Sequence, residues 1–183
     1  RTGFKGRSFD GVLCSDGQVH KPNKSDWHGA LPKSRTVSCT RITMMWNACL
    51  NQYSGRHTGL RTYLDPKYQR KLEALMPDGK GPDFLIFNSN FHDQAIPGIN
   101  QQQHAEHMVA ALGYLLHSPA LRRTQLIWRT AKAPADQKRF LPAGPAQVER
   151  LVDASMAVLD RPAYHRVRVV DIYDTTFPLH WDR

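Results

Sequence analysis

The chain has 183 residues, of which 40% are hydrophobic. This length and composition predict one globular core rather than two. No apolar run approaches the roughly 20 residues that a membrane-spanning helix needs. Lys and Arg number 25 against 16 Asp and Glu, and the resulting net charge of +9 favours partners such as nucleic acid, acidic glycans or an acidic protein.

The chain contains three cysteines, Cys14, Cys39 and Cys49. None of them belongs to a C-x-x-C motif, which argues against a zinc ribbon or a thioredoxin-type site. One disulfide with one free thiol suits an oxidising compartment, and three buried thiols suit a reducing one. The sequence leaves both states open.

The first part of the chain is poor in regular structure. Residues 1–36 are rich in Gly, Pro, Lys, Ser and Asp, so we expect a loop-rich segment with at most short strands. A β-rich stretch follows, and it predicts a strand at 38–46. A short helix is expected at 63–76, because Asp65 is a good cap and Pro66 suits the first helical turn.

Buried strands and amphipathic helices alternate through the rest of the chain. Continuous apolar runs predict strands at 83–88, 124–130 and 167–173. Apolar residues at helical spacing predict helices at 100–117 and 146–159. Such alternation implies right-handed crossovers, so we predict an α/β three-layer sandwich in which these strands and the earlier one form a mainly parallel sheet.

Polar side chains follow the ends of three consecutive predicted strands. The apolar run in PDFLIFNSNFHDQ (82–94) ends in Asn, Ser, His and Asp, and the later ends carry RTAKAP (129–134) and DTTFPLHWD (174–182). In open parallel sheets, ligands bind beyond the carboxyl ends of the strands. The sequence therefore predicts a site at this edge.

These segments, in their order and spacing, resemble an SGNH (GDSL-type) hydrolase domain, closest to the PC-esterase branch of glycan O-acetyltransferases and esterases. The resemblance covers about residues 37–183 and implies a flavodoxin-like topology there. It implies descent from an acyl-ester hydrolase or O-acyltransferase that acts on an acylated, glycan-like substrate, with no cofactor and no metal. It favours the secretory lumen, while an organelle or the cytoplasm stays open.

The resemblance also implies roles for individual residues. The family's G-x-N-D, or G-x-H-D in the PC-esterase branch, matches Asn90-Phe91-His92-Asp93, so Asn90 replaces a glycine of the oxyanion region. The implied catalytic residues are His92, as an oxyanion-side donor, and Asp182, which begins the last D-x-x-H motif. The implied substrate-binding residues are Asn88, Asn90, Asp93, Arg129 and His180.

Two parts of the family's catalytic triad are missing at the expected spacing. No GDS turn precedes the first strand, and the histidine of the last motif would fall two residues beyond Arg183. Because the chain starts at Arg1 rather than Met, it can be the middle of a longer esterase or acyltransferase that supplies the serine and histidine. Alternatively, the protein keeps the fold but has lost the catalytic activity, and the replacement of the oxyanion-region glycine by Asn90 favours this alternative. We expect this chain to be inactive.

Each candidate residue also has a plainer interpretation. His92 and Asp93 could cap the helix that starts near residue 98. His104 and His107 form an H-x-x-H pair, which two exposed helix histidines explain better than a metal site. Residues 180–182 could be a surface loop with one packed indole.

Three functions therefore stay open. The first is an acyl-ester hydrolase or acyltransferase, and the second is a non-catalytic subunit that joins a larger assembly through residues 1–35 and its basic surface. The third is an RNA- or polyanion-binding module. The basic pairs, such as Arg122-Arg123, are scattered along the sequence, so we expect them to be solvated surface rather than a nucleic-acid platform.

Overall fold

A computed structural model of the chain describes residues 9–15, 19–20, 39–44, 59–74, 76, 79–89, 99–131 and 145–176. The chain divides into two compact units, Arg1–Asn47 and Ala48–Arg183, and each unit has its own three-stranded sheet. The expected division into a loop-rich segment at 1–36 and an SGNH-like domain at 37–183 stays a prediction.

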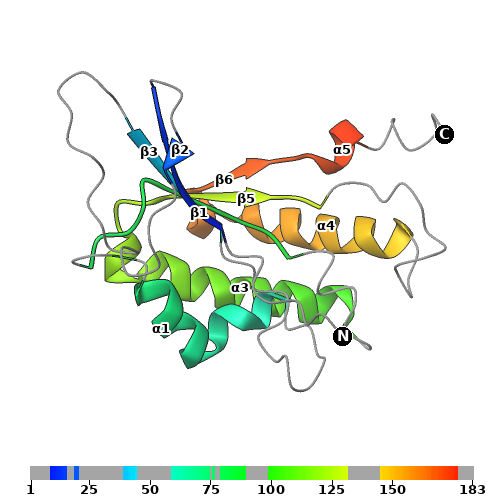
Figure 1. Ribbon diagram of the computed structural model, residues 1–183. Helices are drawn as coiled ribbons and strands as arrows, with labels where there is room; N and C mark the ends of the chain where they lie inside the picture. The colour runs from blue at the N-terminus through cyan, green and yellow to red at the C-terminus, as the bar shows by residue number, and fades with distance from the viewer. Residues whose placement is uncertain are drawn as a thin grey trace, which may run out of the picture. The chain divides into compact units, whose positions relative to one another are not determined.

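The first unit contains an antiparallel sheet of strands β1 (Phe9–Cys14), β2 (Val19–His20) and β3 (Cys39–Met44), in the order β2-β1-β3 (Figure 1). Its central pairing joins β1 to β3 over six residues, from Phe9 opposite Met44 to Cys14 opposite Cys39. The register therefore brings two of the three cysteines to facing positions of the backbone ladder.

The predicted strand at 38–46 exists as β3, but its predicted place in the parallel sheet is wrong. It pairs antiparallel with β1, a strand of six residues inside the segment that we expected to be mostly loop. The partial alternation of apolar and polar residues in this stretch is typical of an antiparallel strand, whereas strands of a parallel sheet read as continuous apolar runs. The alternation at 38–46 differs from the continuous apolar runs of the three later strands, and this difference indicated that the strand belongs to another kind of sheet.

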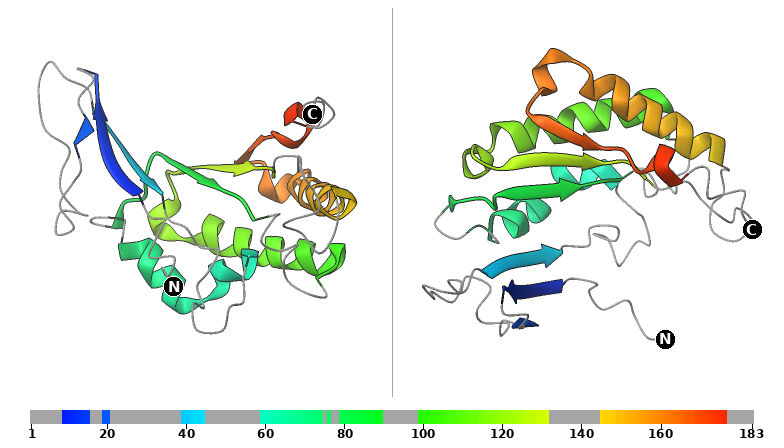
Figure 2. Two further views of the ribbon diagram at one scale, coloured as in Figure 1. Left: turned by 45° about the vertical axis from the view of Figure 1, so that its right-hand side comes forward. Right: turned by 90° about the horizontal axis from the view of Figure 1, so that it is seen from above.

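The second unit contains the parallel sheet, formed by β4 (Phe84–Phe87), β5 (Gln125–Arg129) and β6 (Val167–Val170) in the order β4-β5-β6 (Figure 2). All pairings in it are parallel. This confirms the parallel arrangement that strand–helix alternation predicted for these three strands. The helices of this unit are η2 (Gly59–Leu64), α1 (Pro66–Ala74), α3 (Gln101–His117), η4 (Pro119–Leu121), α4 (Pro145–Leu159), η5 (Pro162–Tyr164) and α5 (Tyr173–Thr176).

Local capping explains where the helices begin. The Asp65 carboxylate accepts the N–H of Lys67 at 2.8 Å, and Pro66 is the first residue of α1, as the sequence predicted. Helix α3 begins with a reciprocal capping box between Asn100 and Gln103. Asn100, rather than His92 or Asp93, is thus the cap of this helix.

The core of the second unit lies between the parallel sheet and its helices. Leu126 and Trp128 point from β5 into it, and both are fully buried. Trp128 makes an edge-on contact with Phe87, whose ring meets Tyr63, and Tyr63 meets Tyr68, with ring centroids 5.3–5.9 Å apart. This aromatic chain ties η2 and α1 to the sheet.

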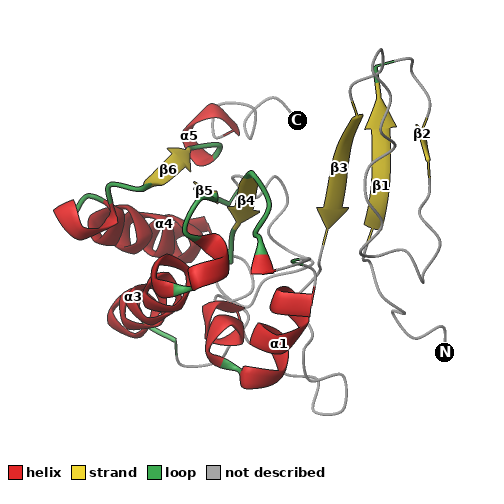
Figure 3. Ribbon diagram, turned by 90° about the vertical axis from the view of Figure 1, so that its left-hand side faces the viewer, coloured by secondary structure: helices red, strands yellow, loops and turns green. Residues whose placement is uncertain are grey.

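One face of the parallel sheet carries the three longest described helices. Figures 1 and 3 show α1, α3 and α4 on the same side of β4-β5-β6. On the other face, Phe84 and Ile86 are 65% and 63% exposed, so this face is open in the described part of the chain. The second helix layer of the predicted sandwich stays a prediction. Within the described residues, no helix has the length and apolar character needed to cross a bilayer.

Candidate functional site

The carboxyl edge of β4-β5-β6 is the candidate site, because all three strands end there in polar residues. Strand β4 leads into Asn88 and Ser89, β5 into Thr130, and β6 into Asp171. The parallel register aligns Phe87 with Trp128, so the residues that follow them are brought side by side.

Asn88 and Arg129 meet across the ends of β4 and β5. The amide oxygen of Asn88, in the orientation that fits its surroundings, accepts hydrogen bonds from Nε of Arg129 at 3.1 Å and from Nη2 of the same guanidinium. Arg129 is exposed and Asn88 is half-buried. The Asn88 amide nitrogen and the remaining guanidinium N–H groups are all donors, so the pair is suited to a ligand carbonyl, hydroxyl or oxyanion.

A second hydrogen-bonded group joins the ends of β5 and β6. The fully buried hydroxyl of Thr130 donates to Oδ1 of Asp171 at 2.8 Å, and it accepts the N–H groups of Ile172 at 2.8 Å and Tyr173 at 3.1 Å. Asp171 also accepts the N–H of Tyr173 at 2.9 Å. This group caps the short helix α5 and fixes the spacing of the two strand ends, so its role is to hold the edge in place.

Tyr173 anchors this group to the core. Its side chain packs with Ala131, Val148 and Val152. Burial raises the pKa of the Tyr173 phenol, and the carboxylates of Glu149, Asp153 and Asp174 raise it further. The phenol therefore stays neutral through the physiological pH range and is not a base for this site.

Ser89 is the buried residue at the end of β4. It is 2% exposed, and among the described residues its hydroxyl has no hydrogen-bond partner. A buried hydroxyl without a partner costs free energy relative to water, so such a group is unusual in a folded core. Its position beside Asn88 places it at the candidate edge.

The structure brings together two of the predicted site residues, Asn88 and Arg129. The other predicted residues lie outside the described part of the chain: Asn90, His92, Asp93, His180 and Asp182. The expected proximity of His92 to Asp182 therefore stays a prediction.

The expected exposure of both histidines in the H-x-x-H pair is wrong for His104. This residue is fully buried, and its Nε2 lies 2.8 Å from Oγ of Ser155 on α4. Within the described residues, no group of three or more His, Cys, Asp or Glu side chains could hold a metal ion. His104 thus links two helices in the core.

Two features of the second unit were not singled out from the sequence. The Thr130–Asp171 group could have been found, because Asp171 follows an apolar strand and precedes a short helix, which is a common capping position. The second feature is a basic hollow at the opposite, amino edge of the sheet, where Arg122 and Arg123 meet Arg166 and Arg168. The pairs Arg122-Arg123 and Arg166/Arg168 are far apart in the sequence, so the sequence did not indicate that they lie at one edge of the sheet.

Comparison of the chain with family models, with curated proteins and with solved structures finds no match in any of the three.

Proposed function

We propose that the chain is an SGNH-hydrolase-like domain, descended from acyl-ester hydrolases or O-acyltransferases, that binds an acylated glycan-like ligand at the carboxyl edge of β4-β5-β6. The observation that carries the proposal is the contact of Asn88 with Arg129 at the ends of two adjacent parallel strands. This edge is where open α/β sheets bind their ligands.

The chemistry of the edge supports an oxygen-rich ligand. Arg129 is exposed, and the Asn88 amide holds its guanidinium in one orientation, so less freedom is lost when a ligand oxygen is bound. Sugar hydroxyls and an ester carbonyl both accept hydrogen bonds from such donors. The Thr130–Asp171 group keeps β5 and β6 in register beside them.

We also propose that this chain does not hydrolyse acyl esters. The triad of the resembled family acts as a unit, so loss of its serine turn alone would remove most of the rate acceleration. Ser89 is the one serine at the described part of the edge, and its burial keeps a substrate carbonyl from reaching its hydroxyl. Asn90 also adds a side chain where the family has glycine.

Two assays test the proposal. In the first, the purified chain is mixed with p-nitrophenyl acetate, and we expect no turnover above buffer. Turnover that Ser89→Ala or His92→Ala abolishes would show that this stretch carries its own catalytic machinery.

The second assay measures binding of an O-acetylated tetrasaccharide by calorimetry. We expect Arg129→Gln to weaken binding about tenfold, because charge-assisted hydrogen bonds to the ligand are lost. The control is Arg150→Gln, which removes an exposed arginine from the surface of α4. Equal affinity in the two variants, or no binding by the unmodified chain, would contradict the proposal.

A further inference from the structure

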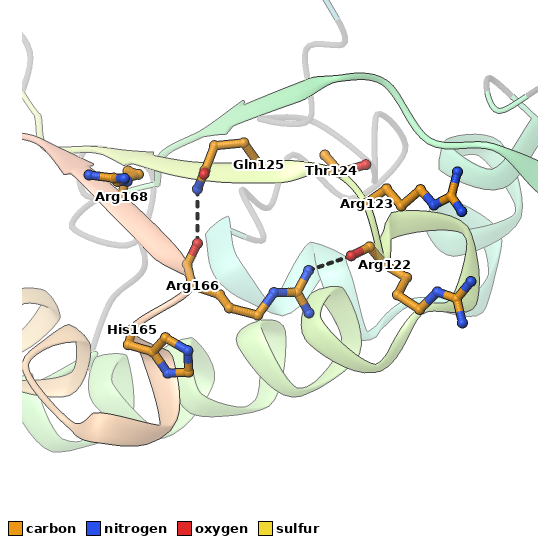
Figure 4. Close-up of a pocket in the computed structure, with 7 residues that line it drawn as sticks. All are labelled: Arg122, Arg123, Thr124, Gln125, His165, Arg166 and Arg168. Atoms are coloured by element: carbon orange, nitrogen blue, oxygen red, sulfur yellow. Dashed lines mark hydrogen bonds between the residues drawn. The ribbon is translucent and has the colours of Figure 1, made fainter.

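The amino edge of the parallel sheet holds a basic hollow, at the opposite end from the candidate site. Its volume is about 370 Å³, and it is lined by Arg122, Arg123, Thr124, Gln125, His165, Arg166 and Arg168 (Figure 4). Among these described lining residues, four carry a guanidinium and none carries a carboxylate. The positive charge in the hollow is therefore not neutralised by an ion pair within its own lining.

The topology explains why two distant pairs of arginines line the same hollow. Arg122 and Arg123 form the turn that leads into β5, and Arg166 and Arg168 lie at the turn into β6 and at its start. Strands β5 and β6 are parallel neighbours, so the turns that precede them reach the same edge of the sheet. The arrangement is a consequence of the crossover through α4.

Two hydrogen bonds hold the hollow in shape. The Nη2 of Arg166 donates to the carbonyl oxygen of Arg122 at 2.9 Å, and the Gln125 side chain donates to the carbonyl oxygen of Arg166 at 2.9 Å (Figure 4). Arg166 is half-buried, whereas Arg122 and Arg168 are exposed. The guanidinium of Arg166 is thus held in place, with exposed arginines on either side of it (Figure 4).

We propose that this hollow binds a small multivalent oxyanion with adjacent phosphate groups, that is, an oligophosphate. Planar guanidinium groups bind phosphate oxygens in a bidentate manner, and four arginines line this one hollow. The volume lies near the lower end of small-molecule sites, which suits a di- or triphosphate. Among the described lining residues, the imidazole of His165 is the single ring, so this part of the hollow lacks the aromatic platform on which nucleic-acid bases stack.

The test is calorimetric titration of the full chain with inorganic triphosphate at about 50 mM salt, where contacts to phosphate are not yet screened. The double variant Arg122→Gln/Arg168→Gln removes two guanidinium groups from the hollow. The matched control, Arg61→Gln/Arg150→Gln, removes two exposed arginines outside the lining. Both variants have the same formal net charge, 9 − 2 = +7.

We expect the dissociation constant for triphosphate to rise about tenfold or more in the hollow variant and less than about twofold in the control. Circular dichroism should show that both variants are folded, because the replaced side chains are exposed. An equal loss in both variants would show attraction by net charge alone and overturn the proposal, as would the absence of triphosphate binding.

Two competition arms test the class of ligand. Displacement of triphosphate by a single-stranded RNA oligonucleotide at lower concentration would reassign the hollow to nucleic acid, and the same result with a sulfated disaccharide would reassign it to sulfated glycans. We expect neither to displace it at equal concentration. A third variant, Arg166→Lys, keeps the charge but loses the planar donor fork, and we expect it to bind triphosphate more weakly than the unmodified chain.

Discussion

Gly81 shows how one residue can fix the path of the chain beside the parallel sheet. Its N–H donates to the carbonyl oxygen of Ala120 at 2.8 Å. A Cβ at this position would stand 2.5 Å from the hydroxyl of Thr124 and 2.6 Å from that same carbonyl oxygen. Any side chain here would therefore force apart the segment before β4 and the turn before β5.

We predict that Gly81→Ala lowers the free energy of unfolding by about 1–3 kcal/mol, which is the usual cost of forcing an extra methyl group into a packed position. The control is Gly113→Ala in α3, where a Cβ would have no neighbour within 4 Å. That change should raise stability by about 0.5–1 kcal/mol, because alanine is the better helix former. Urea denaturation of both variants measures the difference, and a stabilising Gly81→Ala would contradict the packing described.

The residues of the candidate site were only partly predictable from the sequence. Asn88 and Arg129 were chosen because each follows an apolar run, and a parallel sheet brings such positions together. The sequence could not show that the Asn88 amide faces the guanidinium, nor that Ser89 is buried, because both depend on how side chains pack.

At the scale of elements, α3 and α4 are joined by a polar contact inside an apolar interface. The hydroxyl of Ser155 lies 2.8 Å from the carbonyl oxygen of Leu151, to which it donates, and 2.8 Å from Nε2 of His104. The contact therefore links α3 to α4 in the core.

We predict that Ser155→Ala lowers the free energy of unfolding by about 1–3 kcal/mol, because Nε2 of His104 would lose its hydroxyl partner in the core. Ser118→Ala is the matched control, since Ser118 is also buried but its side chain makes no capping hydrogen bond to η4. Thermal unfolding of the two variants compares them. A loss no larger than that of the control would show that the contact adds little.

Local sequence patterns predicted the helices and strands, but they did not always predict which strands pair with one another. Caps and apolar spacing correctly indicated α1, α3 and α4, because these signals lie within the helices themselves. The pairing of β3 with β1 depends on a strand some 25 to 35 residues earlier in the chain, in a segment whose Gly and Pro content indicated loop.

At the scale of the molecule, several tyrosines couple stability to alkaline pH. Burial raises the pKa of Tyr63 well above its usual value, and interaction with Tyr68 raises it further. Burial and the neighbouring Glu73, which accepts a hydrogen bond from the phenol at 3.3 Å, raise the pKa of Tyr114 to about 12. The folded chain thus keeps these phenols protonated after the unfolded chain has released the protons.

We predict that ionisation of these phenols does not change the free energy of unfolding below about pH 10. The free energy of unfolding should then fall as the pH rises from about 10 towards 12. Tyr63→Phe should flatten this decline more than Tyr114→Phe, because Tyr63 is buried and Tyr114 is partly exposed. Urea denaturation at pH 8, 10 and 11 gives the slope. An unchanged slope in Tyr63→Phe would rule out its phenol as a source of the effect.

The two edges of the parallel sheet give the molecule two candidate binding regions with different chemistry. The carboxyl edge offers neutral and cationic donors around Asn88 and Arg129, and the amino edge offers the basic hollow around Arg166. An acylated glycan should therefore select the first region, and an oligophosphate should select the second.

The most direct test of the central claim is a two-dimensional ¹H–¹⁵N NMR titration of the chain with an O-acetylated tetrasaccharide. We expect amide resonances to shift at the carboxyl edge, namely at residues 88–89, 129–131 and 171–173, while those of 122–125 and 165–168 stay in place. Shifts confined to the amino edge, or no shifts at saturating ligand, would contradict it.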